Sequence, residues 1–273
     1  MKTKIIYEDQ HILVCYKPAG LATQTARVGQ QDMVSELKNY LARSAAGKKS
    51  AQPYLGIIHR LDQPVEGLLV FAKDSASAAK LTAQLSQGTL NKQYYAVVCG
   101  QPQVKSAELV DYLAKDEASG SAVVVAHSEG KKAVLQYHVL GQAPVSGQAA
   151  VSGQAAVSGQ AAASGEDGLK QDAGCRASDS PDLSTMRAVT LLDIHIDTGR
   201  FHQIRAQMAH TGLPLLGDSR YGNEISGQIS RDLQVRNVAL CAYKIVLKHP
   251  VTGKQMDFTI KPEGKIFSKF SII

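Results

Sequence analysis

Residues 59–72 of this 273-residue chain read HRLDQPVEGLLVFA. The run of large apolar side chains at 68–72 predicts a strand that is buried on both faces. The turn-forming residues before it place the Asp62 carboxylate in a loop beside a rigid strand, and binding and catalytic residues often occupy such loops. Taken alone, however, the stretch fits a structural ion pair between Arg60 and Asp62 better than a functional site.

Strand and helix patterns alternate irregularly on either side of this stretch. Strands are predicted at 5–7, 11–16, 68–72, 93–98, 134–140, 188–196, 238–248 and 255–260. Helices are predicted after Asp32, with Met33, Leu37 and Leu41 on one stripe, after Asp74, with Ala78, Leu81 and Leu85 on one face, and at 201–211. Because neighbouring strands are mixed with helices rather than repeated as strand–helix units, the order predicts an α+β fold with antiparallel strand pairs.

One segment differs from the rest in composition. Residues 142–165 consist of four six-residue units of the type Gln-Ala-Ala-Val-Ser-Gly. Their Ala and Val side chains cannot bury enough surface to offset the entropy of ordering the chain. We therefore interpret residues 141–186 as a flexible insertion, a linker rather than an interaction segment, in a single domain that spans residues 1–273.

Charge is unevenly distributed along the chain. Lys and Arg number 30 against 24 Asp and Glu, and the insertion holds two of the basic and five of the acidic residues, so 28 basic residues face 19 acidic ones elsewhere. Such a surplus favours a polyanionic partner, because Lys and Arg release counterions from phosphates. Charge alone does not separate this role from one in solubility.

The four cysteines lie far apart, at positions 15, 99, 175 and 241. Without close Cys or His pairs no metal site is expected, and isolated cysteines in apolar surroundings are typical of buried thiols in a reducing compartment. The N-terminus becomes acidic before a signal-type apolar stretch develops, and no apolar run approaches the roughly 20 residues that cross a bilayer. We expect a cytoplasmic protein without a membrane segment.

A second group of candidate functional side chains lies at 197–205, which read DTGRFHQIR. A helix that begins within this stretch would place His202 and Arg205 on one side and Ile204 on the neighbouring stripe, which suits the core. With Arg200, the first two form a basic patch at a helix N-terminus, which suits a phosphate or a partner carboxylate. A solvated basic face is the alternative.

A third group is Tyr94 and Tyr95, in the strand predicted at 93–98. Alternation along a strand places them on opposite faces, so one can face the core and the other a cleft. A tyrosine beside a carboxylate offers a stacking surface for a base and a hydroxyl for proton transfer. Two ordinary strand tyrosines are the simpler explanation when the pair is taken alone.

The order of the motifs is more informative than any one of them. The chain contains KPAGL at 17–21, HRLD at 59–62 followed by Gly67, KQY at 92–94, TGR at 198–200 followed by HQIR at 202–205, GDSRYG at 217–222 and HPVTG at 249–253. In this order it closely resembles the RluA-like family of RNA pseudouridine synthases, from about residue 5 to the C-terminus with the insertion excepted. Chance similarity does not produce so many separate motifs in one order.

The resemblance implies a pseudouridine synthase fold, a bent and mostly antiparallel mixed sheet with flanking helices and a central cleft. It implies an enzyme that isomerises uridine to pseudouridine within RNA, breaking the bond from ribose to the ring nitrogen and forming one to carbon 5, with no metal or organic cofactor. By family frequency, ribosomal RNA is favoured over transfer RNA as the partner. We expect a monomer with no obligate protein partner.

The resemblance also implies catalytic roles. Asp62 matches the catalytic aspartate, which attacks the sugar or abstracts a ribose proton, and the sequence does not decide between the two. Arg205 matches the basic partner of that aspartate, and Tyr94 matches the tyrosine that packs against the target base and assists proton removal from carbon 5. A carboxylate must be ionised to act in this way, and a neighbouring guanidinium favours the charged form.

Substrate contacts are expected from four further residues. Arg60, Arg200 and His202 are candidates for contacts with phosphates, and Ile204 is expected to bind substrate beside them. A structural role at the helix end explains His202 equally well.

The chain departs from the family pattern at several points. Val65 and Glu66 stand where Thr-Ser is common, and a carboxylate near a phosphate is unfavourable unless it points away. Phe201 replaces a common Thr. We expect a chain that consists of the catalytic domain, without the small N-terminal RNA-binding module of many relatives. A protein that binds RNA or assists ribosome assembly without turnover is the alternative, which the presence of all three expected catalytic residues disfavours.

Overall fold

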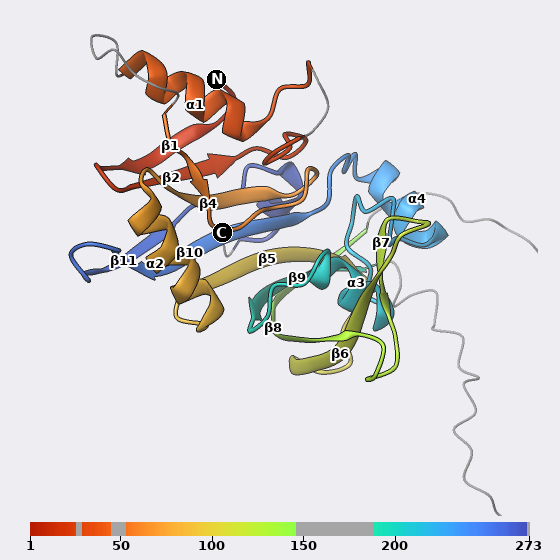
Figure 1. Cartoon of the computed structure of the whole chain (residues 1–273). Helices are drawn as coiled ribbons and strands as arrows, with labels where there is room; N and C mark the ends of the chain where they lie inside the picture. Colours follow the sequence, from red (N-terminus) through yellow and green to blue (C-terminus); the bar gives the residue numbers. More distant parts are fainter. Residues whose placement is uncertain (26–28, 45–52, 146–187, 272–273) are drawn as a thin grey trace, which may run out of the picture.

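The chain folds around one long β-sheet. The computed structural model describes residues 1–25, 29–44, 53–145 and 188–271. Within these residues, 11 strands form a sheet in the spatial order β1-β2-β4-β10-β5-β9-β8-β6-β7, with β3 beside β4 and β11 beside β10. The strands are β1 (Lys4–Glu8), β2 (Ile12–Lys17), β3 (Gly56–Ile57), β4 (Glu66–Ala72), β5 (Asn91–Cys99), β6 (Ser106–Asp116), β7 (Ser121–Val124), β8 (Lys131–Pro144), β9 (Ala188–Ile196), β10 (Leu240–Lys248) and β11 (Gln255–Thr259). Figure 1 shows the sheet turning strongly between its β1 end and its β7 end.

The strand pairs are antiparallel, as predicted, with one exception. β4 and β10 run parallel and are joined by only two residue pairs, Glu66 with Cys241 and Gly67 with Ala242. A Cβ on Gly67 would lie 2.5 Å from the Ala242 nitrogen, and Gly67 has a φ of +133°, a combination that only glycine allows. This close pairing joins the two halves of the sheet directly after the loop that carries Asp62.

The two helices of the N-terminal half form as their sequence patterns predict. α1 (Met33–Ser44) follows Asp32, whose carboxylate accepts a hydrogen bond from Ser35 N at 2.7 Å. α2 (Ser75–Ser86) follows Asp74, which accepts one from Ser77 N, also at 2.7 Å. Each carboxylate satisfies an amide that the first helical turn leaves free.

The C-terminal half differs more from the prediction. α3 (Gln203–His210) is shorter than the predicted 201–211, because His202 adopts the left-handed conformation, with a φ of 51°, and so interrupts the helical run. The helix α4 (Glu224–Asp232), the 3-10 helix η2 (Lys265–Lys269) and the strands β3, β6 and β7 are not evident from the sequence patterns.

Apolar side chains are buried on both faces of the sheet. α1 and α3 pack on the face with the largest cluster, and α2 and α4 pack on the other. Tyr94 and Tyr95 lie on opposite faces of β5, as predicted. Tyr94 is buried in the largest cluster, whereas Tyr95 stacks on Tyr243 with ring centroids 3.7 Å apart.

The expected insertion begins later than predicted. Residues 141–144 extend β8 and pair with β9, so that Pro144 lies opposite Ala188. The rest of the expected insertion, from residue 146, lies outside the described residues. The backbone pairing of this polar end of β8 depends on its partner strand, which composition alone does not reveal.

Three of the four cysteines, Cys15, Cys99 and Cys241, are buried as expected, and Cys175 lies outside the described residues. No helix in the described ranges is long and apolar enough to cross a membrane.

Candidate active site

Neighbouring segments hold the loop that carries Asp62, between β3 and β4. Thr23 Oγ1 donates to the carbonyl of Leu61 at 2.9 Å. The fully buried Lys17 donates from Nζ to three backbone carbonyls, including that of Gln63 at 3.1 Å. Burial lowers the pKa of Lys17 to about 7, although the charge of Asp62 acts in the opposite direction. These bonds fix the loop backbone while the Asp62 side chain stays 25% exposed.

Arg205 joins Asp62 to a second carboxylate. Its Nη1 donates to Asp62 Oδ2 at 2.8 Å, and its Nε and Nη2 donate to the two carboxylate oxygens of Asp218 at 2.7 and 2.8 Å. The Arg205 side chain is only 6% exposed. Burial alone would lower the pKa of Arg205, but the hydrogen bonds and charges of the two carboxylates raise it. The guanidinium is therefore charged and held in one orientation, and the predicted pairing of Arg205 with Asp62 is present.

Asp218 is the member of this group to which the sequence assigned no role. Its fully buried carboxylate also accepts hydrogen bonds from the backbone N–H groups of Arg220 and Tyr221, at 3.0 and 3.1 Å. Burial would raise the pKa of Asp218, but Arg205 and these amides lower it below its ordinary value. With both carboxylates ionised, Asp62, Arg205 and Asp218 together carry one net negative charge.

The segment 217–222 positions Asp218 through its glycine. Gly217 has a φ of +73°, and a Cβ there would lie 2.0 Å from the Asn237 carbonyl oxygen, so only glycine fits. The sequence signal for this site is an aspartate in a glycine-bounded turn after the buried apolar pair Leu215-Leu216. That pattern resembles the setting of Asp62, but it does not reveal that Arg205 is the partner of Asp218.

His202 lies on another side of Asp62. Its left-handed backbone, uncommon outside glycine, precedes α3. The ring nitrogen Nε2 lies 3.5 Å from Asp62 Oδ2, and Nδ1 lies 2.8 Å from the Tyr221 hydroxyl. Burial, followed by the charges of Arg205 and Arg220, lowers the pKa of His202 despite the nearby carboxylates. The lowered pKa favours the neutral form of the ring.

The contacts of the two ring nitrogens favour one tautomer of the neutral ring. The Tyr221 oxygen accepts a hydrogen bond from Ala122 N at 2.6 Å, and its hydroxyl can donate to His202 Nδ1, which lies 2.8 Å away. The ring proton then resides on Nε2, where it faces Asp62. The other tautomer would place a nitrogen lone pair against a carboxylate oxygen, which is unfavourable. His202 is thus held as a donor toward Asp62 rather than as a free phosphate contact.

Tyr94 contributes a neutral phenol on the same face of the sheet. It is buried in the core cluster that also contains Ile204, and its hydroxyl forms no hydrogen bond within the described residues. Burial, and then the charge of Asp62, raise the pKa of Tyr94. The ring is therefore close enough to Asp62 to respond to its charge, and its hydroxyl is uncommitted.

The other predicted substrate contacts differ in exposure. Arg60 is exposed and forms no ion pair with Asp62 in the described part of the chain, so the structural pair considered from sequence is absent. Arg200 is exposed and donates from Nε to the Lys132 carbonyl at 2.9 Å. Ile204 is buried in the core. The structure therefore gathers His202, but not the two arginines, around the carboxylate.

Glu66, the unusual residue of the Asp62 loop, points away from the site. Its buried carboxylate accepts hydrogen bonds from the Tyr16 hydroxyl and from the N–H groups of Glu263 and Gly264, the last two at 3.1 and 3.0 Å. These bonds hold the C-terminal segment against β4. The negative charge of Glu66 therefore does not repel a phosphate near Asp62.

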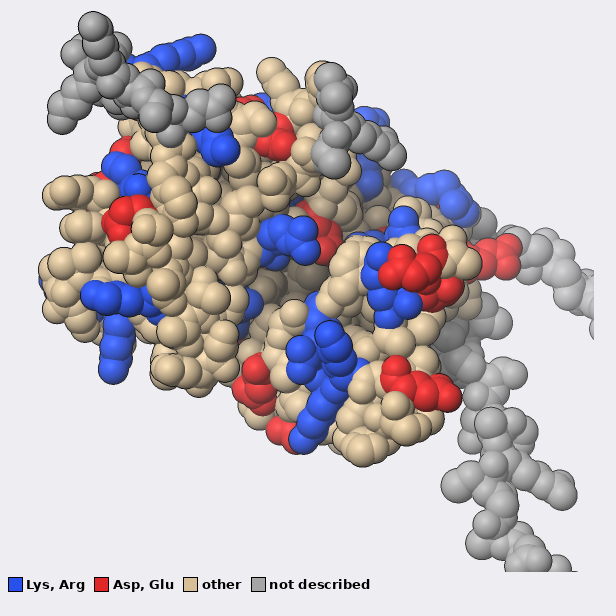
Figure 2. Space-filling view, in the orientation of Figure 1, with Lys and Arg blue, Asp and Glu red and all other residues tan. Residues whose placement is uncertain are grey.

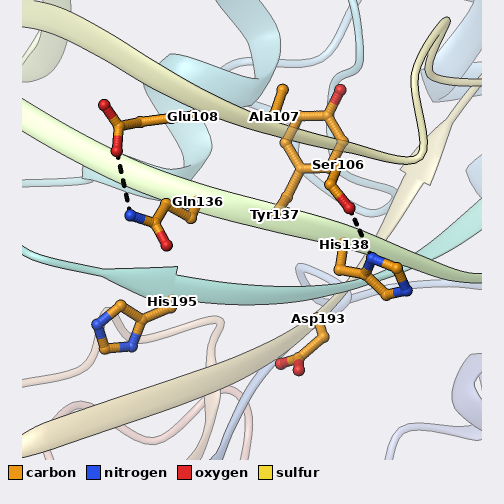
Figure 3. A pocket seen from close by; sticks show the side chains of 8 residues that line it. All are labelled: Ser106, Ala107, Glu108, Gln136, Tyr137, His138, Asp193 and His195. Atoms are coloured by element: carbon orange, nitrogen blue, oxygen red, sulfur yellow. Dashed lines mark hydrogen bonds between the residues drawn. The ribbon is translucent and has the colours of Figure 1, made fainter.

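Two hollows in the surface differ in the side chains that line them. Figure 2 shows a central hollow with Lys and Arg side chains on its sides. A separate hollow of about 450 Å³ lies over β6, β8 and β9 and contains none of the predicted site residues (Figure 3). In it Glu108 pairs with Gln136 at 3.1 Å and Ser106 with His138 at 2.7 Å, so these polar groups satisfy one another. Within the described ranges, no group of three or more His, Cys, Asp or Glu side chains is placed to hold a metal ion.

Comparisons with known proteins identify the family. A family model described as RNA pseudouridylate synthase matches residues 11–210. The ribosomal large subunit pseudouridine synthase D of Pseudomonas aeruginosa is 31% identical over 263 residues, which are 94% of this chain and 67% of that protein. The tRNA pseudouridine synthase C of Yersinia pestis is 27% identical over 261 residues, 94% of this chain and 86% of that protein.

The fold agrees as well. The solved structure of human RNA pseudouridylate synthase domain containing 1 superimposes with a TM-score of 0.66 at 15% identity, covering 95% of this chain and 83% of that one. The mixed sheet, the family match and the Asp62–Arg205 pair point to one conclusion: the chain belongs to the RNA pseudouridylate synthase family, and is an RNA pseudouridine synthase of the RluA-like type.

Proposed function

We propose that this enzyme converts uridine to pseudouridine in large-subunit ribosomal RNA, with Asp62 as the reacting carboxylate. The observation that carries the assignment of Asp62 is its asymmetric environment. Oδ2 is held by Arg205 at 2.8 Å and faces His202 at 3.5 Å, whereas Oδ1 has no partner within the described residues. One oxygen is thus anchored, and the other is available to a ribose.

The ion pair with Arg205 suits a reaction in which Asp62 takes part as a negatively charged carboxylate. Asp218 takes two of the five guanidinium N–H donors and Asp62 takes a third, so Arg205 orients the reacting carboxylate but shares its charge with Asp218. A preorganised ion of this kind needs no rearrangement when the substrate enters. Whether Asp62 attacks the sugar or removes a ribose proton, its negative charge is consumed in that step.

Loss of that charge changes the state of Tyr94. The charge of Asp62 is one of two causes that raise the pKa of Tyr94, so the phenol holds its proton tightly before the reaction. Once Asp62 is neutral, only burial opposes ionisation of the phenol. We infer that Tyr94 first packs against the uracil as a neutral ring and then assists removal of the carbon 5 proton, after the base has detached and carbon 5 has bonded to the ribose.

The exposed cations supply the contacts with RNA. Arg60 and Arg200 are exposed outside the buried Asp62–Arg205–Asp218 group, where their guanidinium groups can meet phosphates. His202 contacts Asp62, and Ile204 packs in the core cluster. Extrusion of the uridine into such a site requires an unstacked base and fixed flanking phosphates. The ribosomal target is supported by the 31% identical relative, which is named for the large ribosomal subunit.

Tritium release from RNA labelled at carbon 5 of uridine tests the target, because that hydrogen is lost when the new bond forms. Unmodified large-subunit ribosomal RNA transcripts should release tritium with the wild-type enzyme, and transfer RNA transcripts should not. Release from transfer RNA alone would contradict the ribosomal assignment. Tight binding to ribosomal RNA with no release from either transcript would favour the alternative, an RNA-binding or assembly protein without turnover.

A further inference from the structure

Phe201 presents an exposed aromatic ring at the edge of the candidate active site. It is 43% exposed, and its ring stacks on that of His202 with centroids 3.7 Å apart and 22° between the planes. The Nε2 atom of His202 in turn lies 3.5 Å from Asp62 Oδ2. A single imidazole ring therefore separates Phe201 from the reacting carboxylate.

The turn that carries Phe201 is rigid. The side chain of Gln203 accepts hydrogen bonds from Arg200 N at 2.9 Å and Thr198 Oγ1 at 2.8 Å, and it donates to the Val134 carbonyl of β8 at 3.0 Å. One amide side chain thus ties the turn to itself and to the sheet. A ring on such a support loses little conformational freedom when a ligand stacks on it.

Cationic side chains lie close to the same turn. Arg200 precedes Phe201 and is fixed to the Lys132 carbonyl at 2.9 Å. Arg220 is near enough for its charge to lower the pKa of His202, and its Nη1 is fixed to the Gly120 carbonyl at 2.9 Å. An exposed aromatic ring with immobilised cations nearby is an arrangement with which proteins bind unpaired nucleotides, through base stacking and phosphate contacts.

We propose that Phe201 stacks on the base of the nucleotide adjacent to the target uridine and thereby selects uridines in unpaired RNA. This inference rests on the proposed function of Asp62. A uridine drawn toward Asp62 leaves its neighbour without a stacking partner on one side. The exposed face of Phe201 replaces that partner and continues a stack of base, Phe201 and His202. A neighbour held in a duplex could not reach the ring, so a uridine inside a stable helix is a poor substrate.

The proposal has a simpler competitor, in which Phe201 only shields His202 from water. The two differ in what they require of the side chain at this position. Stacking requires an aromatic ring, so RNA affinity should follow the order Trp and Phe above Leu and Ala. Loss of the stack in Phe201→Ala should weaken binding by about 5- to 100-fold, with little change in the conversion rate at saturating RNA. Shielding requires only an apolar cover, so Phe201→Leu would then behave as wild type, and Phe201→Ala would shift the pH profile of conversion while leaving affinity unchanged.

A modified RNA makes the test specific to the neighbouring base. Stem-loop RNAs would carry an abasic nucleotide on the 5′ or the 3′ side of the target, and their affinities would be measured with the wild type and with Phe201→Ala. We expect the abasic nucleotide on one side to weaken binding to the wild type and to have little further effect on Phe201→Ala. Additive losses on both sides, or equal affinity of the two proteins for intact RNA, would overturn the proposal.

The matched control is Tyr54→Ala. Tyr54 is also an exposed aromatic residue, at 48% exposure, but it lies beside Ala78 of α2 on the opposite face of the sheet, and its removal should leave RNA affinity unchanged. Because binding is measured without turnover, the stacking result stands apart from the chemistry of Asp62. If Asp62→Asn stays active, the catalytic assignment fails while the stacking result is unaffected. If Phe201→Ala binds RNA as the wild type does, the stacking proposal fails while the assignment of Asp62 is unaffected.

Discussion

The Nη1 atom of Arg205 lies 2.8 Å from Oδ2 of Asp62, although the two residues are 143 positions apart in sequence. The pairing brings the loop before β4 against the first turn of α3. It is stable because the rest of the guanidinium is bound by the buried Asp218. The orientation of Arg205 toward Asp62 therefore depends on the buried carboxylate of Asp218.

Asp218→Asn should lower conversion far more than RNA binding. The substitution removes the charge that orients Arg205, and a misplaced guanidinium would bind Asp62 differently; a displacement of this kind lowers a reaction rate by about 10- to 100-fold. Because a buried ion pair loses one partner, the free energy of unfolding should also fall, by about 3–5 kcal/mol. Single-turnover conversion, RNA affinity and urea unfolding measure the three effects.

Asp257→Asn is the control for that variant, since Asp257 pairs with Lys244 at 3.1 Å on the surface and is 47% exposed. Such pairs contribute between about 0 and 1 kcal/mol, so neither stability nor conversion should change appreciably. If Asp218→Asn behaves like this control, Asp218 does not position Arg205.

Conversion should decline as the pH falls through the depressed pKa of His202, below its ordinary value of 6.5. Protonated His202 would neutralise Asp62 in place of the neutral Nε2–H donor. The free energy of unfolding should already fall between pH 6.5 and that depressed pKa, because the unfolded chain takes up the proton first. His59, whose pKa is also lowered by burial, contributes to the change in stability but not to the charge beside Asp62.

Tyr221→Phe separates these contributions. It removes the hydroxyl that lies 2.8 Å from His202 Nδ1 and can donate to it, and the loss of this bond frees that nitrogen for a proton. The acid limb of the pH–rate profile should therefore move to higher pH, and it should disappear in His202→Gln, which has no titrating group. An unchanged acid limb in both variants would show that His202 does not govern it.

Lys92→Met should stabilise the protein at neutral pH. Lys92 is buried and forms no ion pair within the described residues, and burial lowers its pKa from 10.5 to about 8. The difference corresponds to a penalty of about 3 kcal/mol, present in full below pH 8. Between pH 8 and 10.5 the unfolded chain binds more protons than the native state, so wild-type stability rises with pH.

Thermal unfolding across pH 7 to 11 tests this expectation. Lys92→Met should unfold several degrees higher at pH 7, and its stability should change less with pH in the upper window. Lys131→Met is the control, because Lys131 is exposed on β8. Equal melting temperatures for all three proteins at pH 7 would show that the Lys92 ammonium is not penalised.

Replacement of residues 147–186 by a short Gly-Ser turn should preserve activity and stability. Pro144 pairs with Ala188, so the two ends of the segment lie side by side. A shorter loop costs less closure entropy, which would add up to about 2 kcal/mol to the free energy of unfolding. A deletion that starts at 142 removes strand residues paired with β9 and should lower the melting temperature. Loss of conversion in the first variant alone would assign a role to the repeats.

Much of the fold could be predicted because local signals and burial agree. The helix after Asp74 has both a capping carboxylate and an apolar face, and β9 has the bounds that its apolar run predicts. β6 was not predictable, because its side chains are mostly exposed or half-buried and its order comes from pairing with β8. α4 contains Gly227 and several polar residues and depends on the Asn223 cap and on tertiary packing.

The candidate site could be predicted only in part, because some of its contacts form between segments that are far apart in the sequence. The resemblance of separate motifs identified Asp62 and Arg205 as partners, and the structure places them in contact. Asp218 and Tyr221 belong to a recognisable motif, but their partners become visible only when the fold closes 217–222 over α3. Likewise, the basic patch around His202 suited either a phosphate or a carboxylate, and only the fold places carboxylates beside it.

Single-turnover conversion by Asp62→Asn, with all RNA bound, tests the central claim most directly. Asparagine keeps the size of the side chain and an acceptor for Arg205, but it removes the charge that the reaction consumes. We expect unchanged folding and near-normal RNA affinity with no detectable pseudouridine. Formation of pseudouridine at close to the wild-type rate would contradict the account, because another group would then have to perform the reaction.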